Sequence, residues 1–452
     1  MNKYKKVLKI ALPAVGEMVL FMLVWVIDTA FIGRWGGNDA VSAVGISTEI
    51  LYTIAGIMVT IGISVPITSL VAQKFGAKKM DEAEIYLANG LRIGFLVSLL
   101  VSILLFIFKS QVVSIMGAKG QVFLYSMEYM KFATIGVFFN MMSSLLNSGL
   151  RGIGRTDISL ISAGISNILN IFLDWVLIYG KFGMPEMGVA GSALATLIAF
   201  FVSFLFLSFY YFKFSDLKIK FKLIFDKNKE FTKKIIQLAI PSGFQEGAFS
   251  LGRLLNVAIV LTGLGSLSAA TNQIVTTVES ISFMPGWGFS VAATSLVGQM
   301  IGAKDKDSAI KFARISALLG SIIMTSFAFL YFIFPEFFIG LFIDDPLTIE
   351  LGKKSLRIAA FEQTTMAISM VYAGALKGYG DTKTPFFISL FTNWAIRLPL
   401  IFVSVFLLKL PLEYVWGIMV IQWFIDAVLH FIMFKKKMQG VSFRKFRKKR
   451  IL

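Results

Sequence analysis

The chain has 452 residues, of which 56% are hydrophobic and only 15% are charged, and it contains no cysteine. In soluble domains about 25% of the residues are charged, so this composition excludes a soluble protein. The lack of cysteine excludes disulfide and thiol chemistry. A net charge of +18 would suggest nucleic acid in a soluble chain. Here the basic residues lie in loops and tails, where membrane topology explains them, and no nucleic-acid partner is expected.

Apolar runs long enough to cross a hydrocarbon core of about 30 Å recur along the whole sequence. Alternating ten-residue strands do not occur, so we expect membrane-spanning helices rather than a barrel. Twelve spans are predicted, at 10–33, 42–72, 89–109, 124–149, 157–180, 188–212, 235–262, 267–298, 310–334, 350–375, 383–408 and 412–434.

One stretch occurs twice. Residues 64–83 read SVPITSLVAQKFGAKKMDEA and residues 290–309 read SVAATSLVGQMIGAKDKDSA, with twelve identical positions at an offset of 226. The turns LRGIGRT (150–156) and LKGYGDT (376–382) repeat at the same offset. The sequence therefore predicts a duplicated unit. These basic, glycine-rich turns fit no phosphate-binding spacing, so we interpret them as tight turns.

Basic residues concentrate in alternate loops, which predicts the topology. Because these loops share a side with the amino terminus, both termini are expected in the cytoplasm of a cell inner (plasma) membrane protein. Six spans per repeat make the two repeats parallel. We expect an amino-terminal lobe at 1–212, a Lys-rich cytoplasmic linker at 213–234, a carboxy-terminal lobe at 235–434 and a basic tail at 435–452.

Acidic residues within the first six spans need a functional reason, because an Asp at mid-bilayer costs about 3 kcal/mol. Asp28 lies in the first span and Asp174 in the fifth, where Asn170 precedes it by four residues on the same helical face. Such a group can share a proton or offer hard oxygen ligands to Na⁺. The alternative is that these side chains only join helices through buried hydrogen bonds.

The second half does not repeat these acids. Glu246, Glu279 and Arg397 lie in its spans instead, and Glu362 lies near the outer end of the tenth span. Glu246 is a candidate for binding a proton or a cationic substrate. Arg397 is interpreted as the partner of one of the Glu residues in a buried ion pair.

Asp426 and the only histidine, His430, are four residues apart near the inner end of the last span, and we interpret them as a solvated helix end rather than a pH sensor. ATP-binding, metalloprotease and Ser-His-Asp motifs do not occur in the sequence. We therefore expect no enzyme activity and no cofactor other than a coupling ion.

These features together resemble the multidrug and toxic compound extrusion transporters of the bacterial branch. The resemblance rests on DTAFIGRWG in the first span, the two repeated stretches, the two basic turns and GVAGSALAT at the start of the sixth span. It implies two six-helix lobes around a central cavity that open alternately to each side. It also implies export of cationic amphipathic compounds in exchange for H⁺ or Na⁺, by a protein that can act as a monomer.

The resemblance further implies roles for single residues. Asp28, Asn170 and Asp174 match a cation site, with Thr196 as a fourth member, and Pro13 matches a proline at which the first span bends. Glu246 resembles an acid that some members carry, whereas Thr365 and Met366 stand where such members have a second acid. Two alternatives remain, a flippase for lipid-linked oligosaccharides and a non-transporting receptor or scaffold. The flippase would need more cations than Arg253 and Arg397 provide in the spans.

Overall fold

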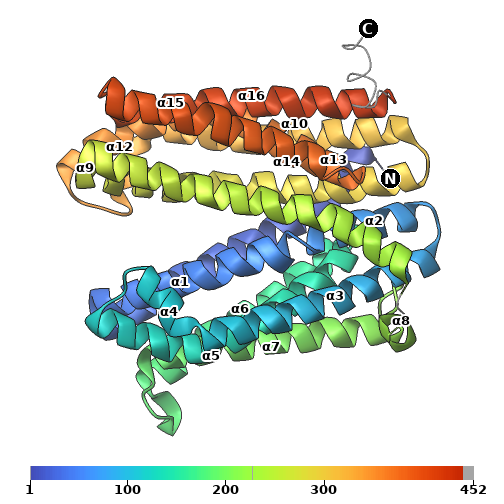
Figure 1. The fold of residues 1–452 in the computed structure, drawn as a ribbon, viewed down its shortest axis with the longest axis horizontal. Helices are drawn as coiled ribbons and strands as arrows, with labels where there is room; N and C mark the ends of the chain where they lie inside the picture. Colours follow the sequence, from blue (N-terminus) through green and yellow to red (C-terminus); the bar gives the residue numbers. More distant parts are fainter. Residues whose placement is uncertain (1, 226–227, 441–452) are drawn as a thin grey trace. The chain divides into compact units, whose positions relative to one another are not determined.

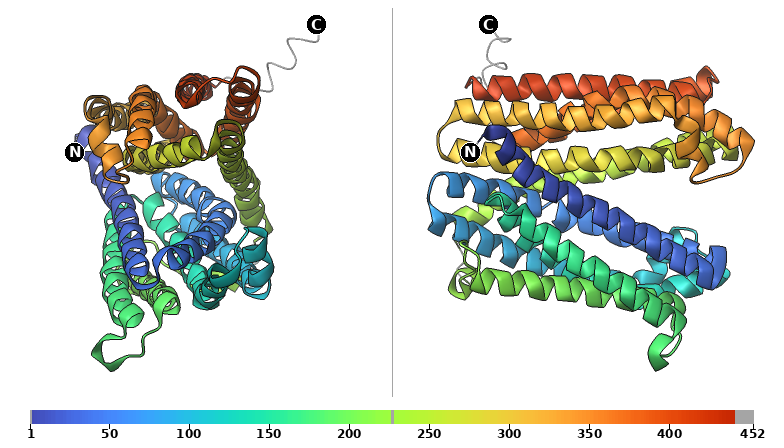
Figure 2. Two further views of the ribbon diagram at one scale, coloured as in Figure 1. Left: turned by 90° about the vertical axis from the view of Figure 1, so that its left-hand side faces the viewer. Right: turned by 180° about the vertical axis from the view of Figure 1, so that it is seen from behind.

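A computed structural model describes residues 2–225 and 228–440, and nearly all of them are helical (Figure 1). The chain forms two compact units, which we call unit N (residues 16–243) and unit C (residues 1–15 and 244–452). Within each unit the long helices run alongside one another (Figures 1 and 2). The fold class predicted from the sequence, an all-helical membrane protein, is confirmed.

Unit N is built from the first half of the sequence, with the amino-terminal part of α9 added. Its elements are α1 (Lys3–Ala55), η1 (Gly56–Thr60), α2 (Ser64–Gly76), α3 (Met80–Ile107), α4 (Lys109–Ile115), α5 (Gly120–Gly152), α6 (Thr156–Tyr179), η2 (Lys181–Gly183), α7 (Gly188–Lys213) and α8 (Phe221–Phe225).

Unit C begins within α9 (Lys229–Gly302) and also takes the amino-terminal part of α1. Its remaining elements are α10 (Lys306–Ile333), α11 (Pro335–Gly340), α12 (Pro346–Ala359), η3 (Ala360–Glu362), α13 (Gln363–Gly378), α14 (Lys383–Leu390), η4 (Phe391–Arg397), α15 (Leu398–Phe402), η5 (Val403–Leu407) and α16 (Leu412–Met438).

Nine helical segments in the described part are long and apolar enough to cross a membrane. Two of them, Lys3–Gly76 and Lys229–Gly302, have 74 residues each and therefore provide two spans apiece. The predicted span 350–375 falls on the broken helix 346–378, whose parts α12 and α13 have 14 and 16 residues and are each too short to be counted among the nine. Each of the twelve predicted spans thus falls on a helix.

The two 74-residue segments turn back at equivalent glycines. Gly37 has φ 62° and Gly265 has φ 83°, and the two positions differ by 228 residues. Residues with a Cβ rarely adopt such a φ, so glycine allows the chain to reverse direction between two spans. In α1–α2 the second span is interrupted again by the π-helical segment η1 and a turn, just before Pro66.

Each unit contains the amino-terminal part of a helix whose remainder belongs to the other unit. Val7, Ile10 and Ala11 of α1 are buried in the core of unit C, against Phe289 and Leu296. In the same way the amino-terminal part of α9 packs in unit N, where Ile235 is buried in the core and the ring of Phe231 lies 4.5 Å from that of Tyr86.

The boundaries of the units therefore differ from the lobes expected at 1–212 and 235–434. The chain passes from one unit to the other between Val15 and Gly16, and again between Gly243 and Phe244. Each crossing lies two residues after a proline inside a helix, Pro13 in α1 and Pro241 in α9. Apolar side chains before each crossing find their core in the opposite half, which no local pattern in the sequence reveals.

The repeated stretch joins two helices in the same way in both units. The hydroxyl of Thr68 in α2 donates to the backbone carbonyl of Ser148 in α5 at 3.0 Å. The hydroxyl of Thr294 in α9 donates to the carbonyl of Gly374 in α13 at 2.9 Å, and both positions are shifted by 226 residues. The duplication that the sequence predicts is thus visible in individual hydrogen bonds.

Glycines of the two basic turns permit this close contact. A Cβ on Gly152 would lie 3.0 Å from the carbonyl oxygen of Thr68, and one on Gly378 would lie 2.4 Å from that of Thr294. Real Cβ atoms essentially never approach other atoms closer than 3.0 Å. The turns therefore serve helix packing, and Gly154 and Gly380 supply their left-handed residues at φ 82° and 88°.

The Lys-rich linker is held against unit N over the part that is described. The backbone N–H of Lys218 donates to Oε1 of Glu84 at 3.1 Å, and the Lys220 ammonium lies 2.5 Å from Oε2 of the same residue. The only helix in residues 214–225 is α8, with five residues. Residues 441–452, which contain most of the predicted basic tail, lie outside the described residues.

Candidate functional site

The acids of the first half meet inside unit N. Asp28 lies on α1, whereas Asn170 and Asp174 lie one turn apart on α6. The carboxyl groups of Asp28 and Asp174 lie beside each other, although 146 positions separate them in the sequence. Asp174 is 0% exposed and Asn170 is 3% exposed, so the group is closed off from solvent on the α6 side.

Several oxygens of this cluster have no hydrogen-bond partner in the described part of the chain. They are Oδ1 of Asp28, both carboxyl oxygens of Asp174 and Oδ1 of Asn170. The Nδ2 group of Asn170 donates to the hydroxyl of Thr196 on α7 at 3.3 Å, which turns its carbonyl oxygen toward the unpartnered side. Buried acceptors without donors are costly, and a proton or a cation would satisfy them.

Three further side chains that the sequence did not single out surround the cluster. Ser192 on α7 lies beside Asp174. Tyr52 lies within electrostatic range of Asp28, and Tyr129 on α5 lies close to both acids and to Thr196. The hydroxyl groups of all three can donate to a carboxylate. Four helical segments therefore contribute polar groups to the cluster.

Pro13 lies inside α1, fifteen residues before Asp28. Proline cannot donate the backbone hydrogen bond that an α-helix needs at this position. Just after it, α1 leaves unit C, and Gly16 packs against Leu160 of α6 in unit N. The weakened turn thus stands where the helix changes units, and the cluster lies three to four turns farther along the same helix.

The second half has a different cluster. Glu279 on α9, Glu362 at the end of η3 and Arg397 at the end of η4 lie within electrostatic range of one another in unit C. Their exposed fractions are 8%, 0% and 7%. Neither carboxyl oxygen of Glu362 has a hydrogen-bond partner among the described residues. With both acids ionised, the two acids and one cation leave the cluster with one net negative charge.

Glu246 lies apart from Glu279. Its charged neighbours are Lys377 and Arg253, so its surroundings are cationic rather than acidic. Arg397 makes no ion pair within 4 Å among the described residues, and its closest polar contacts are Asn393 and the sulfur of Met419. The structure thus separates Glu246 from Glu279 and Arg397, and it adds Glu362, one turn before Met366, to the latter two.

The interpretation of Asp426 and His430 as a solvated helix end is wrong. They are 3% and 1% exposed, and His430 Nδ1 lies 3.0 Å from Oδ2 of Asp426. Both side chains turn into unit C because hydroxyl groups on two other helices, Ser369 and Thr392, bond to the carboxylate. The last span continues to Met438, which places the pair within the helix rather than at its end.

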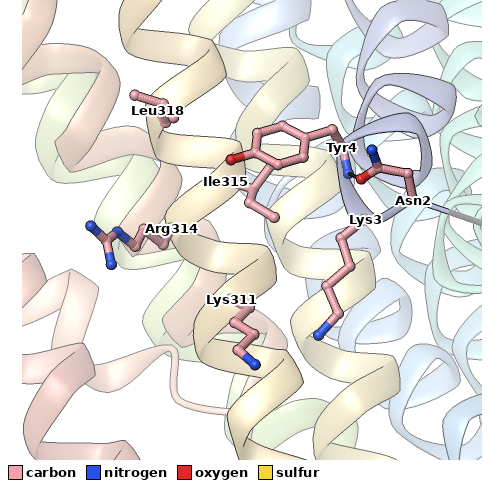
Figure 3. A pocket seen from close by; sticks show the side chains of 7 residues that line it. All are labelled: Asn2, Lys3, Tyr4, Lys311, Arg314, Ile315 and Leu318. Carbon is pink, nitrogen blue, oxygen red and sulfur yellow. Dashed lines mark hydrogen bonds between the residues drawn. The ribbon is translucent and has the colours of Figure 1, made fainter.

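A basic pocket lies at the amino end of α1, within unit C (Figure 3). The side chains of Lys3 and Lys311 extend to the same side, and Arg314 points away from them (Figure 3). The other residues that line the pocket are Asn2, Tyr4, Ile315 and Leu318. This pocket contains no acid and does not suit a cation, so the two carboxyl clusters remain the candidates.

Comparison with known proteins gives one consistent result. The MatE family model matches residues 13–176 and, a second time, residues 241–403. A probable multidrug resistance protein NorM from Thermotoga maritima is 32% identical over 412 residues, which cover 91% of this chain and 88% of that protein. The multidrug resistance protein NorM of Vibrio cholerae is 27% identical over 408 residues, covering 88% of each.

Solved structures agree with respect to the fold. A multidrug resistance MATE family transporter in an outward-facing conformation superimposes with a TM-score of 0.91, at 20% identity, over 98% of this chain and 97% of that one. A MOP superfamily transporter from Pyrococcus furiosus gives a TM-score of 0.90 at the same identity and coverage.

Proposed function

Because the chain belongs to the MatE family of multidrug efflux transporters, we propose that it is a secondary active antiporter driven by H⁺ or Na⁺. In this proposal the cluster of Asp28, Asn170, Asp174 and Thr196 binds the coupling ion. The observation that carries it is the set of buried, unpartnered oxygens on Asp28, Asn170 and Asp174. These oxygens gain their missing partner when a proton or Na⁺ arrives.

The two ions would use the same groups differently. A proton shared between Asp28 and Asp174 removes one of two adjacent negative charges from the membrane interior. Na⁺ would instead take oxygen ligands from both carboxylates, from the Asn170 carbonyl and from the Thr196 hydroxyl, as hard cations prefer. In either case the loaded cluster holds α1 against α6 and α7 more firmly than the empty one, because like charges no longer repel across them.

Coupling to export then requires a conformational difference. The ion and the substrate must prefer different conformers of the same chain, so that binding of one favours release of the other. Pro13 is the proposed hinge, since α1 lacks a backbone hydrogen bond there and changes units two residues later. Movement of α1 at this turn would alter the cluster at Asp28 without breaking the cores of either unit.

The substrates that we propose are cationic amphipathic compounds. The acids Glu279 and Glu362 exceed the single cation Arg397 by one charge, so this cluster of unit C attracts a positive group. Glu246 faces Lys377 and Arg253 and is already compensated. Of the two acids predicted from the sequence, Glu279 is therefore the better candidate for substrate binding.

The decisive experiment measures efflux from proteoliposomes. A fluorescent cationic dye is followed under a pH gradient without Na⁺ and, separately, under a Na⁺ gradient without a pH difference. Asp28→Asn and Asp174→Asn are each expected to lower ion-driven efflux by about tenfold or more. Undiminished ion-driven efflux by Asp28→Asn would overturn the assignment.

A matched control comes from the same helix. Asp157 lies in the first turn of α6 and pairs with Arg155 near the surface, with a side-chain exposure of 44%. Asp157→Asn removes one carboxylate from α6 without touching the cluster and should leave ion-driven efflux unchanged. Glu279→Gln should weaken binding of the dye while the ion dependence of efflux persists.

A further inference from the structure

A second group of titratable side chains is buried in unit C and takes no part in the mechanism above. Asp426 and His430 lie one turn apart on α16, Ser369 lies on α13 and Thr392 lies on η4. All four are at most 3% exposed. We propose that the Asp426–His430 pair is a second proton-binding site, at which His430 takes up and releases the proton.

The hydrogen bonds identify Asp426 as an ionised carboxylate. The Thr392 hydroxyl donates to its Oδ1 at 2.6 Å, and the Ser369 hydroxyl donates to its Oδ2. The Nδ1 atom of His430 also lies 3.0 Å from Oδ2. Three donors converge on one carboxyl group, which is the arrangement that stabilises a buried negative charge rather than a protonated acid.

The same contacts determine which nitrogen of His430 carries hydrogen. Nδ1 lies 2.9 Å from the backbone carbonyl oxygen of Asp426, 3.0 Å from its carboxylate and 3.3 Å from the Ser369 oxygen. The carbonyl and carboxylate oxygens can only accept, so Nδ1 must be the donor in both states of the ring. The nitrogen whose lone pair can bind an additional proton is therefore Nε2.

Nε2 is buried and has no hydrogen-bond partner in the described part of unit C. Without the extra proton it is an acceptor lacking a donor, and with the proton it becomes a donor lacking an acceptor. Either state is therefore stabilised by a conformer that gives Nε2 a partner, such as a water molecule. An unpartnered charged group costs more than an unpartnered neutral one, so protonation of His430 favours the partnered conformer and couples proton binding to the conformation of unit C.

Charge favours a proton at this position. With neutral imidazole the pair carries one net negative charge within a membrane-spanning helix, and with imidazolium it carries none. Imidazole is the side chain that ordinarily changes charge between about pH 5 and 8. In uptake the Nε2 lone pair forms an N–H bond to a proton from hydronium, whose O–H bond breaks and which leaves as water.

The hydrogen bonds given for Asp426 and His430 in the described part of the chain run to no other ionisable side chain. The partners of Asp426 and His430 given above account for their polar contacts among the described residues. On the packed elements the ionisable side chains are Glu350, Lys353, Lys354 and Arg357 of α12, Glu362 of η3, Tyr372 and Lys377 of α13, Lys383 of α14 and Arg397 of η4, and on α16 itself Glu413, Tyr414, Lys435, Lys436 and Lys437.

The test uses the fact that His430 is the only histidine in the chain. Protein labelled with ¹⁵N-histidine and reconstituted in lipid gives one imidazole spin system, which needs no assignment. We expect its Nε2 resonance to move from the neutral to the protonated position as the pH is lowered over the range in which the protein stays folded. In Asp426→Asn the pH dependence of this resonance should differ, because the carboxylate beside the imidazole is gone. A resonance that stays fixed across this range in the unsubstituted protein overturns the proposal.

A transport measurement tests whether transport uses the proton site at His430. This part of the proposal rests on the antiport proposed above. His430→Gln should alter the pH profile of dye efflux and lower the number of protons moved per dye molecule. The control Thr364→Val removes the 2.7 Å hydrogen bond to Thr325 between α13 and α10 and should leave both quantities unchanged. If His430→Gln retains the unsubstituted pH profile and proton count, the proposal is overturned even if His430 titrates. If the unsubstituted protein shows no ion-driven efflux, antiport fails, whereas the ¹⁵N titration still reports on proton binding.

Discussion

Replacing Gly378 by alanine should destabilise unit C more than any comparable change at a helical glycine with open space around it. The new Cβ would stand 2.4 Å from the backbone carbonyl oxygen of Thr294 and 3.1 Å from the backbone nitrogen of Gly298. Both are main-chain atoms, so no side chain can rotate away. Unhindered contact needs about 3.5 Å, which requires α13 and α9 to move apart by roughly 1 Å.

Two costs follow from this displacement. Overpacking a close helix contact costs about 1–3 kcal/mol. The hydrogen bond from the Thr294 hydroxyl to the Gly374 carbonyl, 2.9 Å long, would also be stretched, at a cost of about 1 kcal/mol. The gain in helix propensity from glycine to alanine is at most about 1 kcal/mol, so the net effect on the free energy of unfolding is a loss of roughly 1–3 kcal/mol.

Thermal unfolding in detergent, followed by tryptophan fluorescence, measures this effect against two matched substitutions. Gly417→Ala places its Cβ where nothing lies within 4 Å and should be neutral or slightly stabilising. Gly90→Ala meets the mobile end of Ile67 at 2.4 Å and should fall between the two. The steric reasoning is refuted if Gly378→Ala melts at or above the temperature of Gly417→Ala.

Two other substitutions probe charged contacts. Glu17 and Arg151 form a mostly buried ion pair, with 2.7 Å between the charged atoms. Glu17→Ala should destabilise unit N by roughly 3 kcal/mol, because Arg151 loses its carboxylate partner. Chemical denaturation in detergent measures this loss. Burial raises the pKa of Asp381, but hydrogen bonds from Lys437 and Thr384 outweigh burial and hold that pKa below its usual value. Asp381→Asn should therefore lower the melting temperature at pH 7. The difference in melting temperature from the unsubstituted protein should shrink as the pH falls below the pKa of an unfolded Asp, about 3.9, and then through the lower pKa of folded Asp381.

A specific result would contradict each of the two predictions for Glu17 and Asp381. Lys79 pairs with Glu82 at the surface with 59% side-chain exposure, so Lys79→Ala should cost no more than about 1 kcal/mol. If Glu17→Ala costs no more than Lys79→Ala, the pair with Arg151 is not buried in the way described. A deficit of Asp381→Asn that grows at low pH would mean that its ionised form does not stabilise the fold.

The sequence was sufficient for the features that repeat or that follow local periodicity. Twelve apolar runs predicted the spans, and the offset of 226 predicted a duplicated unit, to which the equivalent hydrogen bonds of Thr68 and Thr294 belong. Asp28 and Asp174 could be singled out because an acid in an apolar run is costly wherever it lies. These signals depend only on neighbours along the chain.

Contacts between distant parts of the chain were beyond such reasoning. Glu279 and Glu362 meet although 83 positions separate them, and no periodicity relates one to the other. The spacing of Asp426 and His430 was visible, but their burial depends on Ser369 and Thr392, which lie on other helices. Tyr52, Tyr129 and Ser192 were missed because aromatic and hydroxyl side chains are common in membrane helices and carry no distinct local signal.

The exchange of helix beginnings has a consequence for synthesis of the protein. The core of unit N includes Ile235, so this unit cannot be completed until the chain has been made well past the end of its own half. Val7, Ile10 and Ala11 share a core with Phe289 and Leu296, which are translated nearly three hundred residues later. Domains normally fold in the order in which they emerge. Here the amino-terminal part of α1 must stay unassembled in the bilayer until the second half of the protein has been inserted.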